Sequence, residues 1–277
     1  MRRTLIISAC LLLLSAIAAG AQEKNTLHYG PDALPIPDIS DGRLPSGVEA
    51  QLSGDLFYGR AVPGQPDWTE ALSFALRIPL WSDRACLGIW GQAGEFYQSN
   101  AAVQSFRGAD PTAPERGSVF TGNLYVSAEM LLLRETPRRP AIVLRSVLKT
   151  ASEPYDRGRM RYFDVPGYFF DIAAGKSFGP FRISVSTGFL CWQASGETQN
   201  DAVMYGIQAS WEKDAVAASL AFGGYKGWIG GGDSPMSIKA RLALGKGQVR
   251  PFAYFQYGIK DYPFTQMSLG VAVGFWD

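Results

Sequence analysis

The chain has 277 residues, with 26 Lys and Arg, 25 Asp and Glu and a single His, and its formal net charge is +1. A balance this close to neutral argues against a nucleic-acid binder, which normally carries a basic excess. One His and three Cys are too few for most metal clusters and for most His-based catalysis. We therefore expect neither a metal nor another cofactor.

The hydropathy and composition narrow the fold class further. A mean hydropathy of −0.02 is too polar for a bundle of membrane helices and too apolar for a disordered chain. Charged residues make up 18% of the chain, aromatic residues make up 13%, and there are 31 glycines. A chain that is rich in glycine and aromatic residues but poor in charge indicates β structure.

The first 21 residues have the pattern of a secretory signal peptide. Arg2 and Arg3 precede an uncharged apolar run over residues 5–18, and Ala19-Gly20-Ala21 forms a small-x-small cleavage site. The apolar run is short for a transmembrane helix, which needs about 20 residues. We expect residues 1–21 to be removed on export.

Residues 22–45 show no periodicity and contain four prolines. Proline removes a backbone donor and fixes φ, so this segment is predicted to be an extended leader and not a strand. The leader would lie in the periplasm or plug the lumen of the domain that follows.

From residue 46 onward, apolar residues alternate with small or polar ones in twelve segments of about 8–13 residues. Soluble strands are usually about 5–6 residues long, whereas strands of this length suit a tilted bilayer crossing. The small, polar face would suit a wet lumen, and the apolar face would meet lipid. The segments cover residues 48–58, 68–80, 85–92, 120–132, 142–149, 168–175, 181–189, 203–212, 216–223, 236–244, 249–260 and 266–275.

The connections between these segments alternate between long and short, as in outer-membrane barrels with longer outer loops and short periplasmic turns. Residues 46–277 are therefore predicted to form an all-β, transmembrane antiparallel up-and-down β-barrel of about twelve strands. The even strand count places both termini in the periplasm. Aromatic residues near both ends of the strands predict two girdles at the membrane interfaces.

The C-terminal segment resembles the terminal-strand signal of Gram-negative outer-membrane β-barrel proteins. That signal has a polar residue, a glycine and two spaced apolar or aromatic residues, which are matched here by Ser268, Gly270, Val273 and Phe275. The match departs at the end of the chain, where Trp276 and Asp277 follow the aromatic position. The resemblance implies an outer-membrane location, with outer-membrane lipid and the barrel-assembly machinery as partners.

The sequence gives little support for a catalytic function. The lipases and proteases among outer-membrane barrels resemble one another in needing a His base, and the sole candidate here is His28 in the proline-rich leader. A base must be held within hydrogen-bond reach of its nucleophile, which a leader does poorly. A membrane-embedded enzyme is therefore the least favoured function.

The charges on the lumen face carry the most information about function, and they comprise eight basic and five acidic residues. They are Arg77, Arg145, Lys149, Arg182, Lys239, Arg241, Arg250 and Lys260, with Glu49, Asp55, Glu129, Asp171 and Glu212.

Two interpretations of these lumen charges stay open. The basic excess favours a monomeric, passive channel for small polar or anionic solutes, including sugars, because Arg and Lys linings favour anions. The pattern is similar to that of twelve-stranded channels for acidic oligosaccharides. Alternatively, the charges form internal ion pairs in a closed lumen, and the barrel is a structural or surface-interaction protein.

Cys86 and Cys191 would remain after export. Cys86 is predicted at the inner end of its strand facing the lumen, and Cys191 near the outer end of another strand facing lipid. A disulfide needs Cα atoms within about 7 Å, so we expect these two cysteines not to pair.

Overall fold

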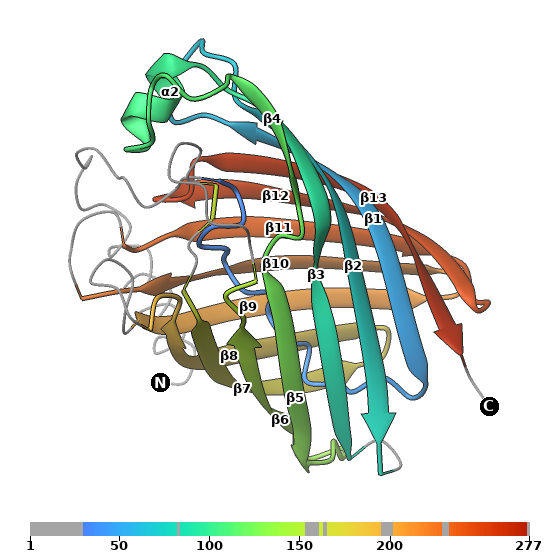
Figure 1. Cartoon of the computed structure of the whole chain (residues 1–277). Coiled ribbons are helices and arrows are strands. Elements are labelled where there is room, and N and C mark those ends of the chain that lie inside the picture. Colours follow the sequence, from blue (N-terminus) through green and yellow to red (C-terminus); the bar gives the residue numbers. More distant parts are fainter. Residues whose placement is uncertain are drawn as a thin grey trace.

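The computed structural model of the chain describes residues 30–81, 84–152, 161–162, 165–194, 202–228 and 233–275. These residues form a closed antiparallel β-barrel of twelve strands, one of which is broken into two pieces, and a single short α-helix (Figure 1). The fold predicted from the alternating segments is thus confirmed. The elements are β1 (Val48–Gly59), β2 (Trp68–Leu80), β3 (Ala85–Gln98), α2 (Ala101–Phe106), β4 (Arg116–Phe120), β5 (Leu124–Leu133), β6 (Ala141–Lys149), β7 (Gly167–Phe178), β8 (Phe181–Cys191), β9 (Ala202–Lys213), β10 (Val216–Lys226), β11 (Met236–Leu244), β12 (Val249–Lys260) and β13 (Phe264–Phe275).

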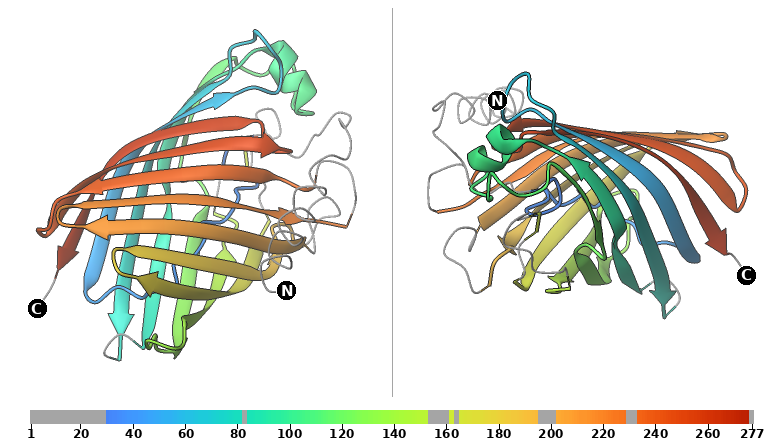
Figure 2. Two further views of the ribbon diagram at one scale, coloured as in Figure 1. Left: turned by 180° about the vertical axis from the view of Figure 1, so that it is seen from behind. Right: turned by 45° about the horizontal axis from the view of Figure 1, so that its top comes forward.

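The barrel closes where the first strand pairs with the last. Strand β1 runs antiparallel to β13 along its whole length, from Val48 opposite Phe275 to Gly59 opposite Phe264. The wall continues through antiparallel pairs between adjacent strands, and β3 pairs with β2, β4 and β5. Figure 2 shows the resulting ring of tilted strands from behind and with its top turned forward. The pairing of β1 with β13 closes the sheet, as a membrane-spanning sheet requires.

Strands β4 and β5 together make one wall strand. Both pair with β3, β4 along Gly94–Gln98 and β5 along Ala85–Gly91. The break falls at Thr121, whose φ of 63° is left-handed and ends the extended backbone. On β3, the register with β2 shifts at the same height, where Leu72 faces Gly94 but Ser73 faces Gln92. A β-bulge at residue 93 therefore changes which face the following side chains occupy.

The two faces of the wall differ as the alternation predicts. Large apolar side chains such as Leu72, Ile207 and Leu269 are exposed on the outside, while the residues beside them in sequence point inward. Exposed aromatic rings mark both ends of the outer face, including Trp68 and Tyr257 at one end and Trp81 and Phe275 at the other. An apolar outer belt between two aromatic girdles is the surface that a bilayer covers.

The two ends of the barrel differ in the length of their connections. One end, called here the short-turn end, carries the connections 81–84, 134–140, 179–180, 214–215 and 245–248, and β1 begins and β13 ends there. The other end, the long-loop end, carries the remaining connections, one of which contains α2. Asn100 caps that helix by accepting a hydrogen bond from the Val103 amide at 3.1 Å. No helix in the described part of the chain is long and apolar enough to cross a membrane.

Cys86 and Cys191 form no disulfide, as expected, and both are buried. Cys86 lies on the lumen face opposite Glu129. The expectation that Cys191 faces lipid is wrong, because this side chain is 4% exposed where β8 ends. The next residue, Trp192, packs into the barrel and keeps the inward register of Leu190.

Candidate functional site: the lumen and the segment inside it

Residues 30–45, called here the lumen segment, run through the barrel from the long-loop end to the short-turn end (Figure 1, blue). At the long-loop end, the Tyr262 hydroxyl donates to the carbonyl of Pro31 at 3.0 Å, and the Asn123 amide donates to the carbonyl of Asp32 at 2.7 Å. At the short-turn end, the Arg182 Nε donates to the carbonyl of Asp41 at 2.6 Å. The segment then joins β1.

Side chains of the barrel wall donate hydrogen bonds to the backbone carbonyls of this proline-rich segment. The Trp192 Nε1 donates to Pro35 at 2.9 Å, the Lys239 Nζ donates to Ile36 at 2.6 Å, and an Arg145 Nη donates to Asp38 at 2.8 Å. An extended segment with proline cannot build a strand ladder, so its carbonyls need other partners. Hydrogen bonds from charged donors contribute about 1.5–3 kcal/mol each.

The upper half of the lumen, toward the long-loop end, contains an apolar core. Leu34 and Ile36 of the lumen segment pack there among side chains from the wall. Trp192 is the largest fully buried side chain and makes edge-on contacts with Phe169 at 5.7 Å and Tyr125 at 5.8 Å between ring centroids. The other members of the cluster are Val147, Leu190, Ala202, Met204, Tyr225, Tyr262 and Phe264.

Two glycines make room for the segment halfway along the lumen. Gly206 of β9 and Gly223 of β10 lie opposite each other in register and face inward. A Cβ atom added at Gly206 would overlap the Cδ1 atom of Ile39, and one added at Gly223 would lie 2.7 Å from it. The wall is flat here because both side chains are missing, and Ile39 lies in that space.

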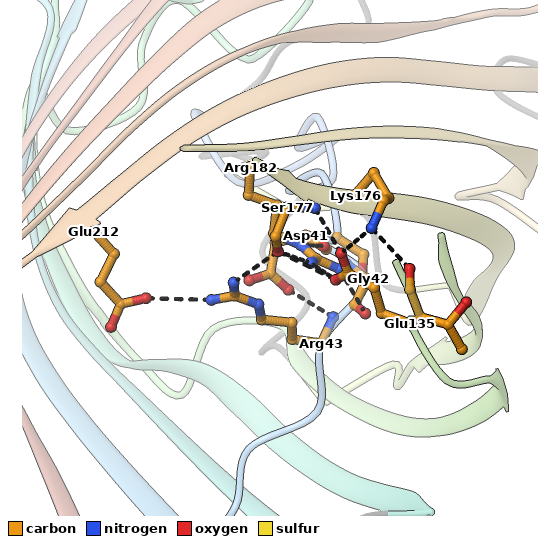
Figure 3. A network of polar contacts seen from close by, with 10 residues as sticks. Asp41, Gly42, Arg43, Glu135, Lys176, Ser177, Arg182 and Glu212 are labelled. Atoms are coloured by element: carbon orange, nitrogen blue, oxygen red, sulfur yellow. Dashed lines mark hydrogen bonds and ion pairs between the residues drawn. The ribbon is translucent and has the colours of Figure 1, made fainter. Parts of the chain in front are cut away.

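A charged network holds the lower end of the lumen segment (Figure 3). Arg182 contacts the carbonyl of Asp41 and also donates to the Glu135 carboxylate at 2.6 Å. Arg43 forms an ion pair with Glu212 at 3.2 Å and donates to the Ser177 hydroxyl at 3.3 Å. Residues far apart in sequence therefore meet where the segment leaves the barrel.

Glu135 is the carboxylate shared by this network, and it lies in the turn between β5 and β6. Partial burial by itself would raise its pKa, but hydrogen bonds from the Ser177 amide at 2.8 Å, Lys176 at 2.9 Å and Arg182 outweigh it. They lower the pKa of Glu135 to about 2. The carboxylate is thus kept ionised as the common partner of two cations.

Side chains from the long-loop end form a second buried network of charges at the upper end. Arg161 donates through Nε to Glu95 at 2.7 Å and through Nη2 to the Thr69 hydroxyl at 2.6 Å, and all three side chains are buried. Burial lowers the pKa of Arg161, but the Glu95 carboxylate outweighs this and raises the pKa above its usual range. Arg107 of the loop that carries α2 pairs with the buried Asp67.

Among the described residues, five of the eight predicted lumen cations form ion pairs with carboxylates. Three of these pairs join two predicted residues on strands that are adjacent or separated by one strand. They are Arg77 with Glu129 at 3.0 Å, Arg145 with Asp171 at 2.8 Å, and Arg250 with Glu49 at 2.7 Å. Arg182 pairs with Glu135 and Lys239 pairs with Asp38 at 2.6 Å. Most of the predicted lumen cations are thus paired with carboxylates inside the barrel.

The remaining predicted charges are placed as follows. Arg241 donates to the Gln51 side chain at 3.1 Å and lies over the Phe252 ring at 4.0 Å. Asp55 accepts from the Ser53 hydroxyl at 3.1 Å. Lys149 is buried at the upper end of β6, and Lys260 lies on the lumen register at the upper end of β12.

A cavity of about 670 Å³ remains beside the lumen segment. The segment is hydrogen-bonded to β6, β8 and β11, and the cavity extends along β1, β2, β12 and β13. Its lining is rich in hydroxyl and amide groups together with paired charges. Polar wall residues in the lining include Gln51, Ser53, Ser73, Ser127, Arg241, Tyr254, Gln256, Gln266 and Ser268.

The residues of this site that sequence reasoning missed include four charged ones, for identifiable reasons. Glu135 lies in a turn, and Asp38 and Arg43 lie in the leader, so none of them belongs to an alternating segment. Glu95 follows the bulge on β3, which moves it to the lumen face. His28, the one candidate base, lies outside the described residues.

The residues matched to the C-terminal signal lie on β13. Ser268 and Gly270 face the lumen, where a Cβ atom at Gly270 would meet the Phe252 ring at 2.5 Å. Phe275 is exposed on the outer face. Trp276 and Asp277 lie outside the described residues.

Comparison with known proteins supports the fold. No family model and no curated protein matches the sequence. Among solved structures, the NanC porin is similar at 7% identity, with 82% of this chain and 100% of the porin covered and a TM-score of 0.51. The KdgM porin is similar at 8% identity, with 82% and 99% covered and a TM-score of 0.49. Outer membrane phospholipase A from Escherichia coli is similar at 11% identity, with 85% and 99% covered and a TM-score of 0.44.

At these identities the likeness concerns the fold alone, and only the first of the three TM-scores exceeds 0.5. The closed ring of twelve strands, the apolar outer belt and the alternation of loop lengths point to the same architecture. The chain folds as an outer-membrane β-barrel.

Proposed function

We propose that this protein is an outer-membrane barrel whose lumen is held closed by residues 30–45, and that it serves as a structural or surface-interaction protein. The observation that carries the proposal is the set of wall donors aimed at the segment's carbonyls, with Lys239, Arg145 and Arg182 at successive depths. A segment that is hydrogen-bonded along its length and packed around Trp192 obstructs free diffusion.

Conductance in planar bilayers tests this proposal. The full chain is expected to insert without discrete current steps, and a variant lacking residues 30–45 is expected to conduct. Folding of both proteins is checked by their heat-modifiable mobility on gels. Steady current steps of equal amplitude from both folded proteins would contradict a closed lumen.

A second candidate is passage of small polar or anionic solutes when the segment leaves the lumen. The cavity of about 670 Å³ beside the segment, lined by hydroxyl and amide groups, favours it. Removing the segment would also remove Asp38 from Lys239 and uncover Arg145 and Arg182. The wall would then present its basic excess, and such linings favour anions.

The reversal potential across a KCl gradient tests this second function in the variant lacking residues 30–45. An anion preference is expected, and Arg241→Glu with Arg250→Glu should abolish or invert it. The matched control is Lys246→Glu, a charge reversal in an exposed turn at the short-turn end. A reversal potential that the double change leaves unaltered would count against an anion path.

A further inference from the structure

The cavity beside the lumen segment is lined by a cation that forms no ion pair within the described residues. Arg241 of β11 makes one hydrogen bond, to the Gln51 side chain at 3.1 Å, and its guanidinium lies 4.0 Å from the centre of the Phe252 ring. A guanidinium carries five N–H donors, so most of the donors of Arg241 remain available to a solute in the cavity.

The other cations that line this cavity are each paired with a carboxylate. The pairs are Arg43 with Glu212, Arg77 with Glu129, Arg145 with Asp171, Lys239 with Asp38, and Arg250 with Glu49. Paired charges largely cancel each other's field, whereas Arg241 keeps its charge uncompensated. The guanidinium of Arg241 is therefore the place in this lining where a negatively charged group would bind.

An uncompensated carboxylate lines the same cavity. Asp55 of β1 accepts hydrogen bonds from the hydroxyls of Ser53 and Ser73, and it pairs with no cation in the described part of the chain. Asp32 of the lumen segment also lines the cavity and lies near enough to Asp55 for the two charges to repel each other. A positively charged group would therefore bind at Asp55.

Arg241 and Asp55 belong to one row of residues across the wall. Arg241 lies opposite Tyr254 of β12 in register. Ser268 of β13 lies opposite Tyr254 on one side and opposite Asp55 on the other. The guanidinium of Arg241 is turned toward Gln51, which is four residues from Asp55 on β1, and four residues span about 13 Å along a strand. The two charges face one cavity but are too far apart to pair with each other.

We propose that this cavity binds a short zwitterionic peptide of about three residues, with its carboxylate at Arg241 and its ammonium group at Asp55. Three extended residues span about 10 Å, and a charged hydrogen bond of about 2.8 Å at each end covers the remaining separation. A single amino acid is too short, because its two charged groups are attached to the same carbon atom.

The wall between the two charges suits the peptide groups of such a ligand. Gln256 and Gln266 lie opposite each other in register and line the cavity with carboxamides, which both donate and accept hydrogen bonds. The Tyr254 hydroxyl donates to Gln256 at 2.9 Å, and the Gln266 amide donates to Ser268 at 3.1 Å. These contacts hold the polar groups in place before a ligand arrives, which lowers the entropy cost of binding.

The site is present while the lumen segment occupies the barrel. The cavity of about 670 Å³ is within the range of about 300–1,000 Å³ that is usual for ligand pockets. It reaches the short-turn end, where the lining side chains of Arg43 and Glu212 are 47% and 64% exposed, so a solute can enter there. Arg241 and Asp55 both belong to the wall. The inference therefore goes beyond the proposed function and does not depend on whether the barrel conducts.

Calorimetric titration of the full chain in detergent with trialanine tests the proposal. The matched probes are N-acetyl-trialanine, which lacks the ammonium group, and trialanine amide, which lacks the carboxylate. Trialanine is expected to bind at least about tenfold more tightly than either capped peptide, because each capped peptide loses one charged hydrogen bond. Equal affinities for the three peptides, or no heat of binding with any of them, would overturn the proposal.

Two variants separate the contributions of the two ends. Asp55→Asn should bind trialanine and N-acetyl-trialanine equally and still bind trialanine amide more weakly, and Arg241→Gln should show the opposite pattern. Lys246→Met, in an exposed turn, should bind all three peptides as the native chain does. Heat-modifiable mobility on gels checks that each variant is folded, and the three peptides on the native chain decide the question if a variant does not fold. A folded variant that keeps the native preference at its altered end would overturn the assignment of that end.

Discussion

Gly206 and Gly223 face each other across β9 and β10, and the Cδ1 atom of Ile39 occupies the space that their missing side chains leave. The position of the lumen segment therefore depends on these two wall residues, because a side chain at either glycine would occupy the space that Ile39 fills. Glycine weakens a strand interior, so its presence at two paired positions indicates a close approach of backbone or side chain.

Gly206→Leu is therefore expected to displace the lumen segment and produce discrete current steps in planar bilayers. The matched control is Gly54→Leu, because Gly54 lies on the outer face of β1 with no atom within 4 Å of an added Cβ. The control should fold and remain without current. Current-free behaviour of folded Gly206→Leu would show that Ile39 can move aside without opening the lumen.

Arg182 is expected to be the strongest single anchor of the segment, because it donates to two of its carbonyls and to Glu135. Arg182→Met should lower the free energy of unfolding by about 1.5–3 kcal/mol, the contribution of a charged hydrogen bond. Urea unfolding in detergent measures the change. Lys246→Met, in an exposed pair with Asp214 at 3.6 Å, should change stability by less than about 1 kcal/mol. Equal effects of both substitutions would exclude an anchoring role.

The two faces of one strand should respond oppositely to the same substitution. Ile207 of β9 is 48% exposed on the outer belt, and its neighbour Gln208 lines the cavity. Ile207→Arg is expected to destabilise the barrel by about 2–4 kcal/mol near the bilayer midplane, and Gln208→Arg much less. Unfolding in lipid vesicles compares them. Similar losses for both would mean that the outer belt does not contact lipid.

The barrel and its facing could be predicted from the sequence because period-2 alternation is a local signal. The alternation over residues 203–212 predicts opposite faces for Ile207 and Gln208, and the structure confirms this. The signal fails where the backbone departs from the regular pleat. Glu95 follows a bulge, so its face does not follow from counting by two. Cys191 keeps the register that the alternation gives it, opposite Tyr168, but alternation does not predict that it is buried at the end of β8.

The candidate site could be predicted only in part, because it joins periodic wall residues to an aperiodic segment. Arg145 and Asp171 were placed on the lumen face, but their pairing depends on strand register, which single-strand patterns do not contain. The partnership of Lys239 with Asp38 spans 201 residues in sequence. The prolines predict an extended segment. Which wall side chains donate hydrogen bonds to its carbonyls can be seen only once the barrel has closed around it.

The last prediction concerns acid stability and follows from the lowered pKa of Glu135, about 2 against an ordinary value of 4.5. A carboxyl whose pKa is lower in the folded state than in the unfolded state stabilises the fold above its unfolded pKa. That contribution falls as the pH drops from about 4.5 through about 2 and the folded group takes up a proton. The stability difference between the native chain and Glu135→Gln should therefore be largest at neutral pH and vanish near pH 2. Urea midpoints in detergent across this range measure it, with Asp214→Asn, an exposed turn carboxyl paired at 3.6 Å, as the control that should show little difference at any pH. A difference for Glu135→Gln that is constant between pH 2 and 4.5 would mean that the carboxylate does not hold Arg182 and Lys176 through its charge.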